Sequence, residues 1–225
     1  MGKFLNFRTL KADEIECRVG TVTDKGVSLL MYKDARVDMQ LLDETVGAAN
    51  WERSHELING NLFCTVSVRW GDTWVRKQDV GTESNTEKEK GQASDAFKRA
   101  CFNFGIGREL YTCPFVWINL NANEWRTGAN GRKQPSVRFH VDTIEYDEQR
   151  RVSHLLVKDD KGVIRYRYGV AKEDNDAKME AIDQVKRCAS REELEAIYHK
   201  YAELNNDKDF ITACQEQTAK FPKTA

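Results

Sequence analysis

Apolar and polar residues alternate along several stretches of the first 80 residues, which is the pattern of half-buried β-strands. Residues 18–23 and 27–32 are two such stretches around the turn sequence Asp24-Lys25-Gly26, and together they predict a β-hairpin. Residues 33–46 follow with apolar side chains at near-helical spacing and a glycine behind them, which predicts a helix. Three β-rich stretches separated by turn signals then predict an antiparallel meander over residues 51–58, 62–70 and 73–80.

The stretch after the meander changes to helical periodicity. From Ala93 to Phe104 apolar side chains recur every three or four residues, which predicts a helix with one buried stripe. Thr86 and Glu89 have the spacing of a capping box at its start, and Gly105 is a suitable stop. We expect this helix to pack across the meander and to form a β-β-β-α unit with it.

The second half of the chain predicts more strands and then helices. Residues 121–135 are polar and contain glycines, so we expect a loop there. The other expected elements are strands over residues 115–120, 136–146, 152–158 and 163–168, and helices over residues 176–189, 190–203 and 207–220. The expected fold class is therefore α+β, with extra β hairpins and a helical tail added to the β-β-β-α core. The expected segments are a core of residues 1–120, an additional β-strand region of residues 121–172 and a helical tail of residues 173–225.

Composition places the chain among soluble globular proteins. Apolar residues make up 40% and charged residues 32%, and the five Trp, ten Phe and seven Tyr argue against disorder. No apolar run approaches the roughly 18–20 residues that a membrane helix needs, and the first residues lack the apolar stretch of a signal peptide. Six scattered cysteines without a CxxC pair indicate free thiols. We therefore expect a cytoplasmic protein with no membrane partner.

Several catalytic motifs are absent from the sequence. There is no GxxxxGK[ST] phosphate-binding loop, no GxGxxG motif after a strand and no GxSxG nucleophile elbow. The four histidines are isolated from one another and from the cysteines, so a zinc site or a histidine-based catalytic group has no support. ATP-driven recombinases and helicases are thereby disfavoured. We expect no cofactor and no bound metal.

A carboxylate cluster keeps one enzymatic alternative open. Asp79, Glu83 and Glu87 precede Lys88 and Lys90, and an acidic cluster with lysine after a sheet can hold Mg²⁺ in a nuclease. Acidic residues are also favoured in the first turn of any helix, because they face the positive end of its dipole. A magnesium-dependent nuclease therefore remains an alternative.

The cations are the candidates for contact with nucleic acid. Net charge is −1, so affinity for a polyanion requires a local stripe of positive charge. Lys98 and Arg99 lie off the apolar stripe of the predicted helix, where they could reach phosphates. Arg36 stands on the first helix, and Arg76 and Lys77 end a strand that also carries a tryptophan. These positions suit single-stranded nucleic acid, and they also suit ordinary ion pairs and core edges.

Three ordered motifs resemble those of a known family. They are MYKDARVDMQLLDETVGAANW at residues 31–51, the meander ending in QDVGTES at residue 84, and SDAFKRACFNFGIGRELY at residues 94–111. Over roughly residues 15–120 the chain resembles the core of phage single-strand annealing proteins of the Sak type. These belong to the superfamily of Rad fifty-two and Rad twenty-two-like recombination proteins. The rest of the chain resembles the helical tails of phage recombination proteins.

The resemblance implies a fold and a mechanism. The family's β-β-β-α module assembles into rings or helical filaments, binds single-stranded DNA in a positively charged groove and anneals complementary strands without ATP. On this sequence the family's groove pair falls on Lys98 and Arg99, and its helix arginine falls on Arg36. The family often has another basic residue three positions beyond the pair, where this chain has Phe102. That contact is then expected from other candidates, which are Arg76, Lys77 and Arg108.

The resemblance thus predicts a protein that binds and anneals single-stranded DNA in recombination and repair, without covalent catalysis, in the cytoplasm of a bacterial host. The expected partners are single-stranded DNA and further copies of the chain in a ring or filament. The acidic helical tail is a candidate site for a phage exonuclease or a host single-strand binding protein. A non-enzymatic adaptor that acts through this tail, with little DNA binding of its own, is the second alternative.

Overall fold

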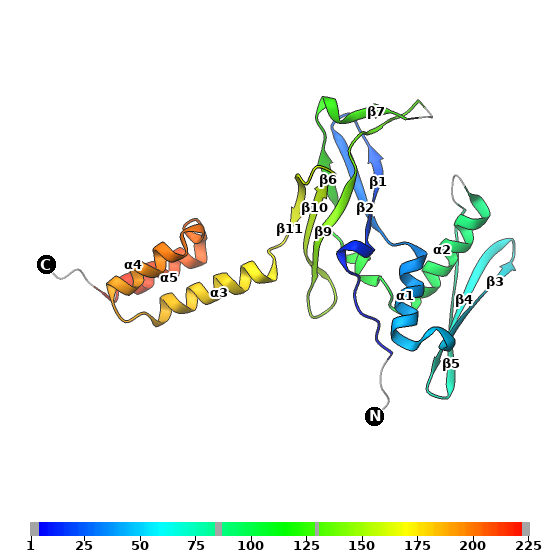
Figure 1. Cartoon of the computed structure of the whole chain (residues 1–225), viewed down its shortest axis with the longest axis horizontal. Coiled ribbons are helices and arrows are strands. Elements are labelled where there is room, and N and C mark those ends of the chain that lie inside the picture. The colour runs from blue at the N-terminus through cyan, green and yellow to red at the C-terminus, as the bar shows by residue number, and fades with distance from the viewer. Residues whose placement is uncertain (1–4, 84–86, 129–130, 222–225) are drawn as a thin grey trace. The chain divides into compact units, whose positions relative to one another are not determined.

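The computed structural model describes residues 5–83, 87–128 and 131–221 (Figure 1). The chain divides into two compact units, Met1–Tyr168 and Gly169–Ala225. The first unit combines antiparallel sheets with helices, and the second is helical. The expected α+β class with a helical C-terminal region is therefore confirmed.

A six-stranded antiparallel sheet forms much of the first unit. Its strands lie in the order β11-β10-β9-β1-β2-β6. The predicted hairpin of residues 18–23 and 27–32 is present as the β1–β2 pair, and apolar side chains such as Val27 and Leu29 enter the core from it. The strand bounds are β1 Glu16–Val22, β2 Gly26–Tyr32, β6 Val116–Asn119, β9 Phe139–Tyr146, β10 Val152–Asp159 and β11 Ile164–Tyr168.

The two edge strands of this sheet approach each other, so the sheet curls around an apolar interior. Arg165 of β11 donates from Nη2 to the carbonyl oxygen of Asn119, the last residue of β6, at 2.9 Å. The hydroxyl of Tyr166 donates to the carbonyl oxygen of Phe115 at 3.2 Å. Strands from before and after residue 120 thus belong to one sheet, whose buried apolar residues include Leu29, Ile118, Val141, Leu155 and Val157.

The loop expected over residues 121–135 is wrong in part, because this stretch contains a short hairpin. β7 (Trp125–Thr127) pairs antiparallel with β8 (Lys133–Pro135), and Arg126 lies opposite Gln134. Figure 1 shows this hairpin extending beyond the end of the six-stranded sheet. Two strands of three residues each are too short for an alternating pattern to distinguish them from a polar loop.

The predicted meander is present as a separate three-stranded sheet in the order β3-β4-β5. Cys64, Val66 and Val68 of its middle strand are fully buried on the face covered by the helix that follows the meander. Phe97 and Cys101 of that helix are also fully buried there, as the apolar stripe predicts. The strand bounds are β3 Trp51–Ile58, β4 Asn61–Trp70 and β5 Thr73–Val80.

Two α-helices accompany the sheets in the described part of the first unit. α1 (Ala35–Val46) begins slightly later than predicted, because the side chain of Asp34 accepts a hydrogen bond from the backbone N–H of Arg36 and caps the helix. α2 (Lys88–Asn103) begins before the apolar stripe does, since its first turn is polar. Thr86, half of the proposed capping box, lies outside the described residues.

Gly105 terminates α2, as predicted, two residues after the last helical residue, Asn103. This glycine has a φ of +94°, and its N–H donates to the carbonyl oxygen of Phe102, while the N–H of Ile106 donates to that of Cys101. The two bonds form the glycine C-cap known as the Schellman motif. The described 3₁₀ helices are η1 Ala12–Glu14, η2 Ala48–Asn50, η3 Arg108–Thr112, η4 Ala122–Glu124 and η5 Ala202–Leu204.

The described part of the second unit contains three α-helices, as its periodicity predicts. The hydroxyl of Ser190 accepts a hydrogen bond from the backbone N–H of Glu193 and so caps the middle helix. The helix bounds are α3 Lys172–Arg187, α4 Arg191–Lys200 and α5 Lys208–Thr218, and their core includes Ala181, Val185, Leu194, Phe210 and Cys214. Nowhere in the described ranges is a helix both long and apolar enough to cross a bilayer.

Candidate nucleic-acid interface

Lys98 of α2 packs against the end of β2 and is almost completely buried. The residue is 5% exposed. Its ammonium contacts the hydroxyl of Tyr32, the last residue of β2, and lies 3.9 Å from the centre of the tyrosine ring. The helix can hold Lys98 there because its neighbours Phe97 and Cys101 anchor α2 to the core. Packing therefore fixes the position of this cation.

The electrostatic environment of Lys98 disfavours its charged form. Burial is the main cause, and the nearby guanidinium of Arg18 adds to it, so that the pKa of Lys98 falls to about 8, although the carboxylate of Glu16 opposes the shift. Among the described residues no carboxylate lies within ion-pair distance of the Lys98 ammonium. A desolvated cation without an acidic partner is costly for the fold, and groups of this kind occur preferentially at functional sites.

Arg18 completes this cluster and was not among the residues predicted from the sequence. It is exposed on β1, and its guanidinium carbon lies 5.9 Å from the centre of the Tyr32 ring. In the hairpin register Arg18 is opposite Leu30, which puts it diagonally next to Tyr32 on the same face. The hairpin was predicted, so carrying its register one step further would have identified Arg18.

Two hollows meet at this cluster, and both are lined by Tyr32, Asp95 and Lys98. The first, of about 210 Å³, lies on the side of Arg18 and is completed by polar residues and glycine: Thr82, Glu83, Gly91 and Ser94. The second, of about 200 Å³, lies on the opposite side and is completed by Met31, Lys33, Phe102, Leu110 and Tyr111. We call the two hollows together the Lys98 groove. It is polar on one side of the lysine and aromatic on the other.

The aromatic end of the groove combines rings with a buried cation. The rings of Phe102 and Tyr111 lie 5.1 Å apart between centres, and Tyr111 is 73% exposed. The ammonium of Lys33 lies 4.5 Å from the centre of the Phe102 ring. The position where a further basic residue was expected, Phe102, thus carries an aromatic face beside a cation. The exposed ring of Tyr111 beside it suits the stacking of an unpaired base.

Lys33 itself belongs to a buried ion pair beneath the groove. Its ammonium contacts the carboxylate of Asp38, and both residues are almost completely buried. Burial raises the pKa of Asp38 to about 6, although the lysine opposes this shift. The pair joins the end of β2 to α1 and supports the floor of the groove.

Arg99 points away from Lys98, although the two are adjacent in sequence. Its Nε lies 3.3 Å from Oδ1 of Asp79 on β5, and its side chain is 44% exposed. Neighbouring residues on a helix differ in direction by about 100°, so one member of the pair faces the six-stranded sheet and the other faces the meander. Lys98 and Arg99, predicted as a pair, therefore contact different parts of the protein.

Arg36 and Arg108 are exposed, and both are engaged in local bonds. Arg36 lies 3.0 Å through Nε from Oδ1 of Asp34, which raises the pKa of the guanidinium. Arg108 donates from Nε to the carbonyl oxygen of Phe102 at 2.6 Å and from Nη2 to that of Asn103 at 2.9 Å. Arg108 therefore satisfies carbonyl groups at the end of α2.

Arg76 and Lys77 lie on opposite faces of the meander. Lys77 is paired with Val66, so it shares the face of the sheet that α2 covers. Arg76 is paired with Ser67 and shares the other face with Trp74. A single strand lying on one face of the meander could contact one of these two cations but not both.

The carboxylates that a nuclease would use to bind Mg²⁺ form ion pairs with neighbouring cations. Glu83 pairs with Lys88 at 3.4 Å, and Asp79 accepts from Arg99. Glu87 pairs with Lys90 at 3.1 Å. Within the part of the chain that the structure describes, no group of three or more His, Cys, Asp and Glu side chains is arranged to hold a metal ion.

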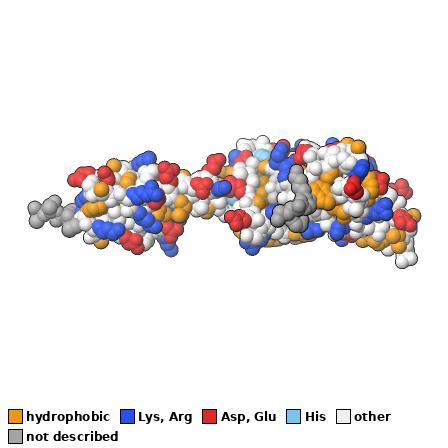
Figure 2. Space-filling model, turned by 90° about the horizontal axis from the view of Figure 1, so that it is seen from below, with side chains coloured by type: hydrophobic (Ala, Val, Ile, Leu, Met, Phe, Trp, Pro, Cys, Tyr) orange, Lys and Arg blue, Asp and Glu red, His pale blue; other side chains and the backbone are white. Residues whose placement is uncertain are grey.

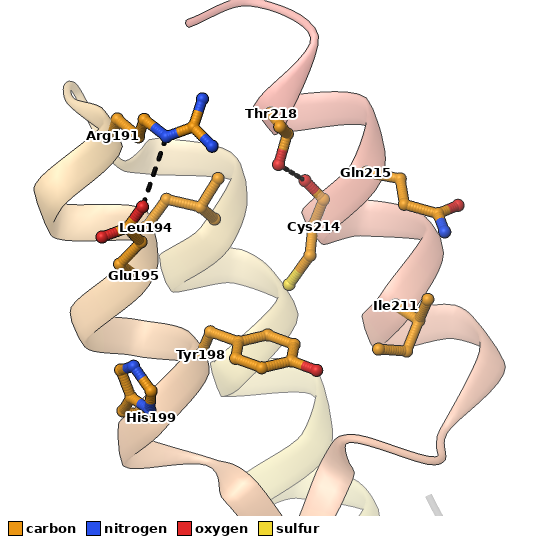
Figure 3. A pocket seen from close by; sticks show the side chains of 9 residues that line it. All are labelled: Arg191, Leu194, Glu195, Tyr198, His199, Ile211, Cys214, Gln215 and Thr218. Atoms are coloured by element: carbon orange, nitrogen blue, oxygen red, sulfur yellow. Dashed lines mark hydrogen bonds and ion pairs between the residues drawn. The ribbon is translucent and has the colours of Figure 1, made fainter. Parts of the chain in front are cut away.

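The second unit has a hollow of about 290 Å³ between α4 and α5 (Figure 3). Apolar side chains, including Leu194, Tyr198 and Ile211, form much of its lining. The bonds drawn in Figure 3 stay within single helices: Arg191 to Glu195 at 3.2 Å, and Thr218 to the carbonyl oxygen of Cys214 at 2.7 Å. This hollow follows the seam between two helices.

Positive charge is local on this protein. The face shown in Figure 2 carries Lys and Arg side chains interspersed with Asp and Glu in both units, in agreement with a net charge of −1. A polyanion would therefore be held by particular clusters and not by a general field.

Two curated proteins are similar to this chain, and both carry the name single-stranded DNA-binding protein DdrA. The protein from Deinococcus radiodurans is 35% identical over 107 residues, which are 47% of this chain and 49% of that protein. The protein from Deinococcus deserti is 33% identical over 114 residues, which are 49% of this chain and 56% of that protein. The chain thus spans about half the length of these relatives. No protein-family model and no solved structure matches the chain.

Proposed function

We propose that this protein binds single-stranded DNA, with the Lys98 groove as the central contact. The observation that carries the proposal is the burial of Lys98 beside Tyr32 and Arg18 without a carboxylate partner among the described residues. The similarity to two single-stranded DNA-binding proteins supports the same ligand. A phosphate placed between Lys98 and Arg18 would bring a negative charge into direct contact with both cations, which the nearby carboxylates of the hollow do not do.

The groove also offers a place for bases. Its aromatic end, with Tyr111 exposed beside Phe102, is suited to stacking against a base whose phosphate lies at Lys98. Phosphate contact and stacking do not depend on sequence, so the expected binding is general for single strands. No step of this binding requires a covalent bond to form or break.

The finer proposal is that the bound strand is annealed to a complementary one without ATP, by an oligomeric ring or filament of the Sak type. A ring repeats a local cluster many times, which would allow a subunit of net charge −1 to hold a long polyanion. Arg36 and Arg99 would be further backbone contacts, and the supplementary candidates are Arg76, Lys77 and Arg108. The helical unit would serve contacts with an exonuclease or a single-strand binding protein.

The test compares the wild type with Lys98→Met, which keeps an unbranched side chain against Tyr32 and removes the charge. Affinity for a labelled oligonucleotide, measured by fluorescence anisotropy, is expected to fall roughly tenfold or more, because a charge-assisted contact contributes about 1.5–3 kcal/mol. Lys186→Met removes the same charge from an exposed position on α3 and serves as the matched control.

The same samples are then mixed with two complementary strands, in EDTA and without nucleotide. Annealing by the wild type and by the Lys186→Met variant, with loss in Lys98→Met, is the expected result. Equal affinity of wild type and Lys98→Met would contradict the proposed groove. Shortening of the DNA on addition of Mg²⁺ would instead favour a nuclease.

A further inference from the structure

A second hollow in the first unit lies where β1 and β9 separate. The two strands are paired at Glu16 and His140. Next to this point, bounded by the β7–β8 hairpin, is a cleft of about 760 Å³. Its lining consists of Ile15, Glu16, Cys17, Val19, Arg126, Gln134, Pro135, Val137, Arg138, Phe139 and His140. We call it the β1–β9 cleft.

Two arginines give this cleft its charge. Arg126 of β7 and Arg138, which immediately precedes β9, are both exposed. Among the described residues, neither guanidinium has a carboxylate within ion-pair distance. Residues 125–140 contain four Lys and Arg and no Asp or Glu, and two of these cations, Arg126 and Arg138, line the cleft. Glu16 is the one acidic residue of the lining.

The register of the sheet connects this cleft to the Lys98 groove. Glu16 is opposite His140 in an antiparallel pair. The next residues whose side chains lie on the same face are therefore Arg18 on β1 and Arg138 just before β9. Arg18 also lines the polar end of the Lys98 groove. The groove and the cleft are therefore neighbours across β1, and Arg18 stands between them.

We infer that the β1–β9 cleft is a second binding site for the phosphate backbone of single-stranded DNA. It would hold the part of the same strand that continues beyond the Lys98 groove. The inference rests on the proposed function. Two unpaired arginines in an open cleft can each neutralise a phosphate, and contacts of this kind supply affinity that weakens with salt. The strand would pass from Lys98 over Arg18 to Arg138 and Arg126.

The β7–β8 hairpin is held in place by contacts away from the two arginines. The ammonium of Lys133 lies 4.2 Å from the centre of the Trp125 ring and 3.2 Å from Oδ1 of Asp24 in the β1–β2 turn. Arg126 and Arg138 can therefore be replaced without removing the bonds that position the hairpin. This separation makes the pair suitable for a test by substitution.

The test uses the full chain with Arg126→Ala and Arg138→Ala combined. The control is Lys186→Ala combined with Arg187→Ala, which removes the same charge from exposed positions on α3. Affinity is measured by fluorescence anisotropy at several salt concentrations, for strands of about 5 and about 25 nucleotides. Circular dichroism melts establish that each variant is folded.

The cleft variant is expected to bind the longer strand roughly tenfold more weakly than the control does. Its slope of log affinity against log salt should be shallower by about 1.4, because each lost phosphate contact on a single strand accounts for roughly 0.7. The short strand, which fills the Lys98 groove alone, should bind the cleft variant and the control equally.

Two results would overturn the inference, and they are distinguishable. Equal affinity and equal salt slope of the cleft variant and control for the longer strand, with binding lost in Lys98→Met, would refute the cleft and leave the proposed function intact. Absence of binding by the wild type at low salt would refute both.

Discussion

Lys98 is a buried cation at the centre of the proposed DNA site. Its burial and the nearby Arg18 lower the pKa to about 8, so the charged form is held at a cost to folding. The hydroxyl and ring of Tyr32 compensate only in part, since neither carries a full negative charge. An apolar residue would serve packing at least as well, and the lysine is best explained by an anion that binds there.

This reasoning predicts that Lys98→Met stabilises the protein in the absence of DNA. In the unfolded chain the pKa of lysine is about 10.4, above the value of about 8 in the folded protein. The folded state therefore binds fewer protons than the unfolded state between pH 8 and pH 10, and the free energy of unfolding of the wild type rises with pH over that window. At pH 7 the variant is expected to be more stable by about 1–3 kcal/mol.

Urea unfolding at pH 7 and pH 10 measures this difference. The advantage of Lys98→Met over the wild type should shrink towards pH 10, while Lys186→Met should track the wild type at both values. A variant that is less stable than the wild type at pH 7, or an advantage that does not change with pH, would show that the lysine is a structural residue.

At the residue scale, the sequence predicts which cations could contact DNA, and the structure shows where their side chains lie. The resemblance of the chain to a known family indicated Lys98 as a candidate. The burial of Lys98 depends on Tyr32 at the end of β2, 66 positions away in sequence. Arg108 was a plausible phosphate contact by charge alone, and its guanidinium is bonded to the end of α2. The burial of Lys98 follows from a contact between distant segments, and the bonds of Arg108 follow from the turn that ends α2. Charge and periodicity encode neither.

At the scale of elements, α2 is the link between the two sheets. Its apolar face packs on the meander, and its Lys98 contacts β2 of the six-stranded sheet. The helix lies close to Gly81, which follows β5. A Cβ at Gly81 would come within 2.1 Å of the carbonyl oxygen of Gln92 and 2.6 Å of the backbone nitrogen of Ala96.

Gly81→Ala is therefore expected to displace α2 from the meander. Backbone atoms cannot give way as a flexible side chain can, so we expect a loss of roughly 1–3 kcal/mol in the free energy of unfolding. Chemical denaturation measures this loss, and affinity for single-stranded DNA should fall with it because Lys98 moves with the helix. Gly131→Ala is the control, because no atom lies within 4 Å of the added Cβ. It measures the cost of replacing a glycine without a steric clash, and this cost includes the strain of alanine at a positive φ. Equal stability of Gly81→Ala and wild type would contradict this close approach.

Elements with a clear period were predictable, and those without one were not. The meander, both long helices of the first unit and the three helices of the second follow from apolar spacing and turn signals. The β7–β8 hairpin has three residues in each strand and no apolar alternation, so its pairing emerges only from the fold around it. The joining of strands from before and after residue 120 in one sheet is likewise a long-range property.

At the scale of the whole molecule, a nearly neutral chain relies on local arrangements of charge. The Lys98 groove and the β1–β9 cleft share β1, and together they collect Lys98, Arg18, Arg138 and Arg126 in the first unit. The similarity to the DdrA proteins covers about half of the chain. Annealing and assembly therefore stand as proposals for the whole protein, and the Lys98 groove is the part of the account that can be tested first.

The most direct test is to measure the pKa of Lys98 by NMR titration of its side chain, with and without a saturating oligothymidine. We expect a pKa of about 8 in the free protein and a rise of at least one unit with DNA bound, because a phosphate at the ammonium favours the charged form. An ordinary pKa for Lys98 in the free protein, or a lowered value that bound DNA leaves unchanged, would contradict the central claim.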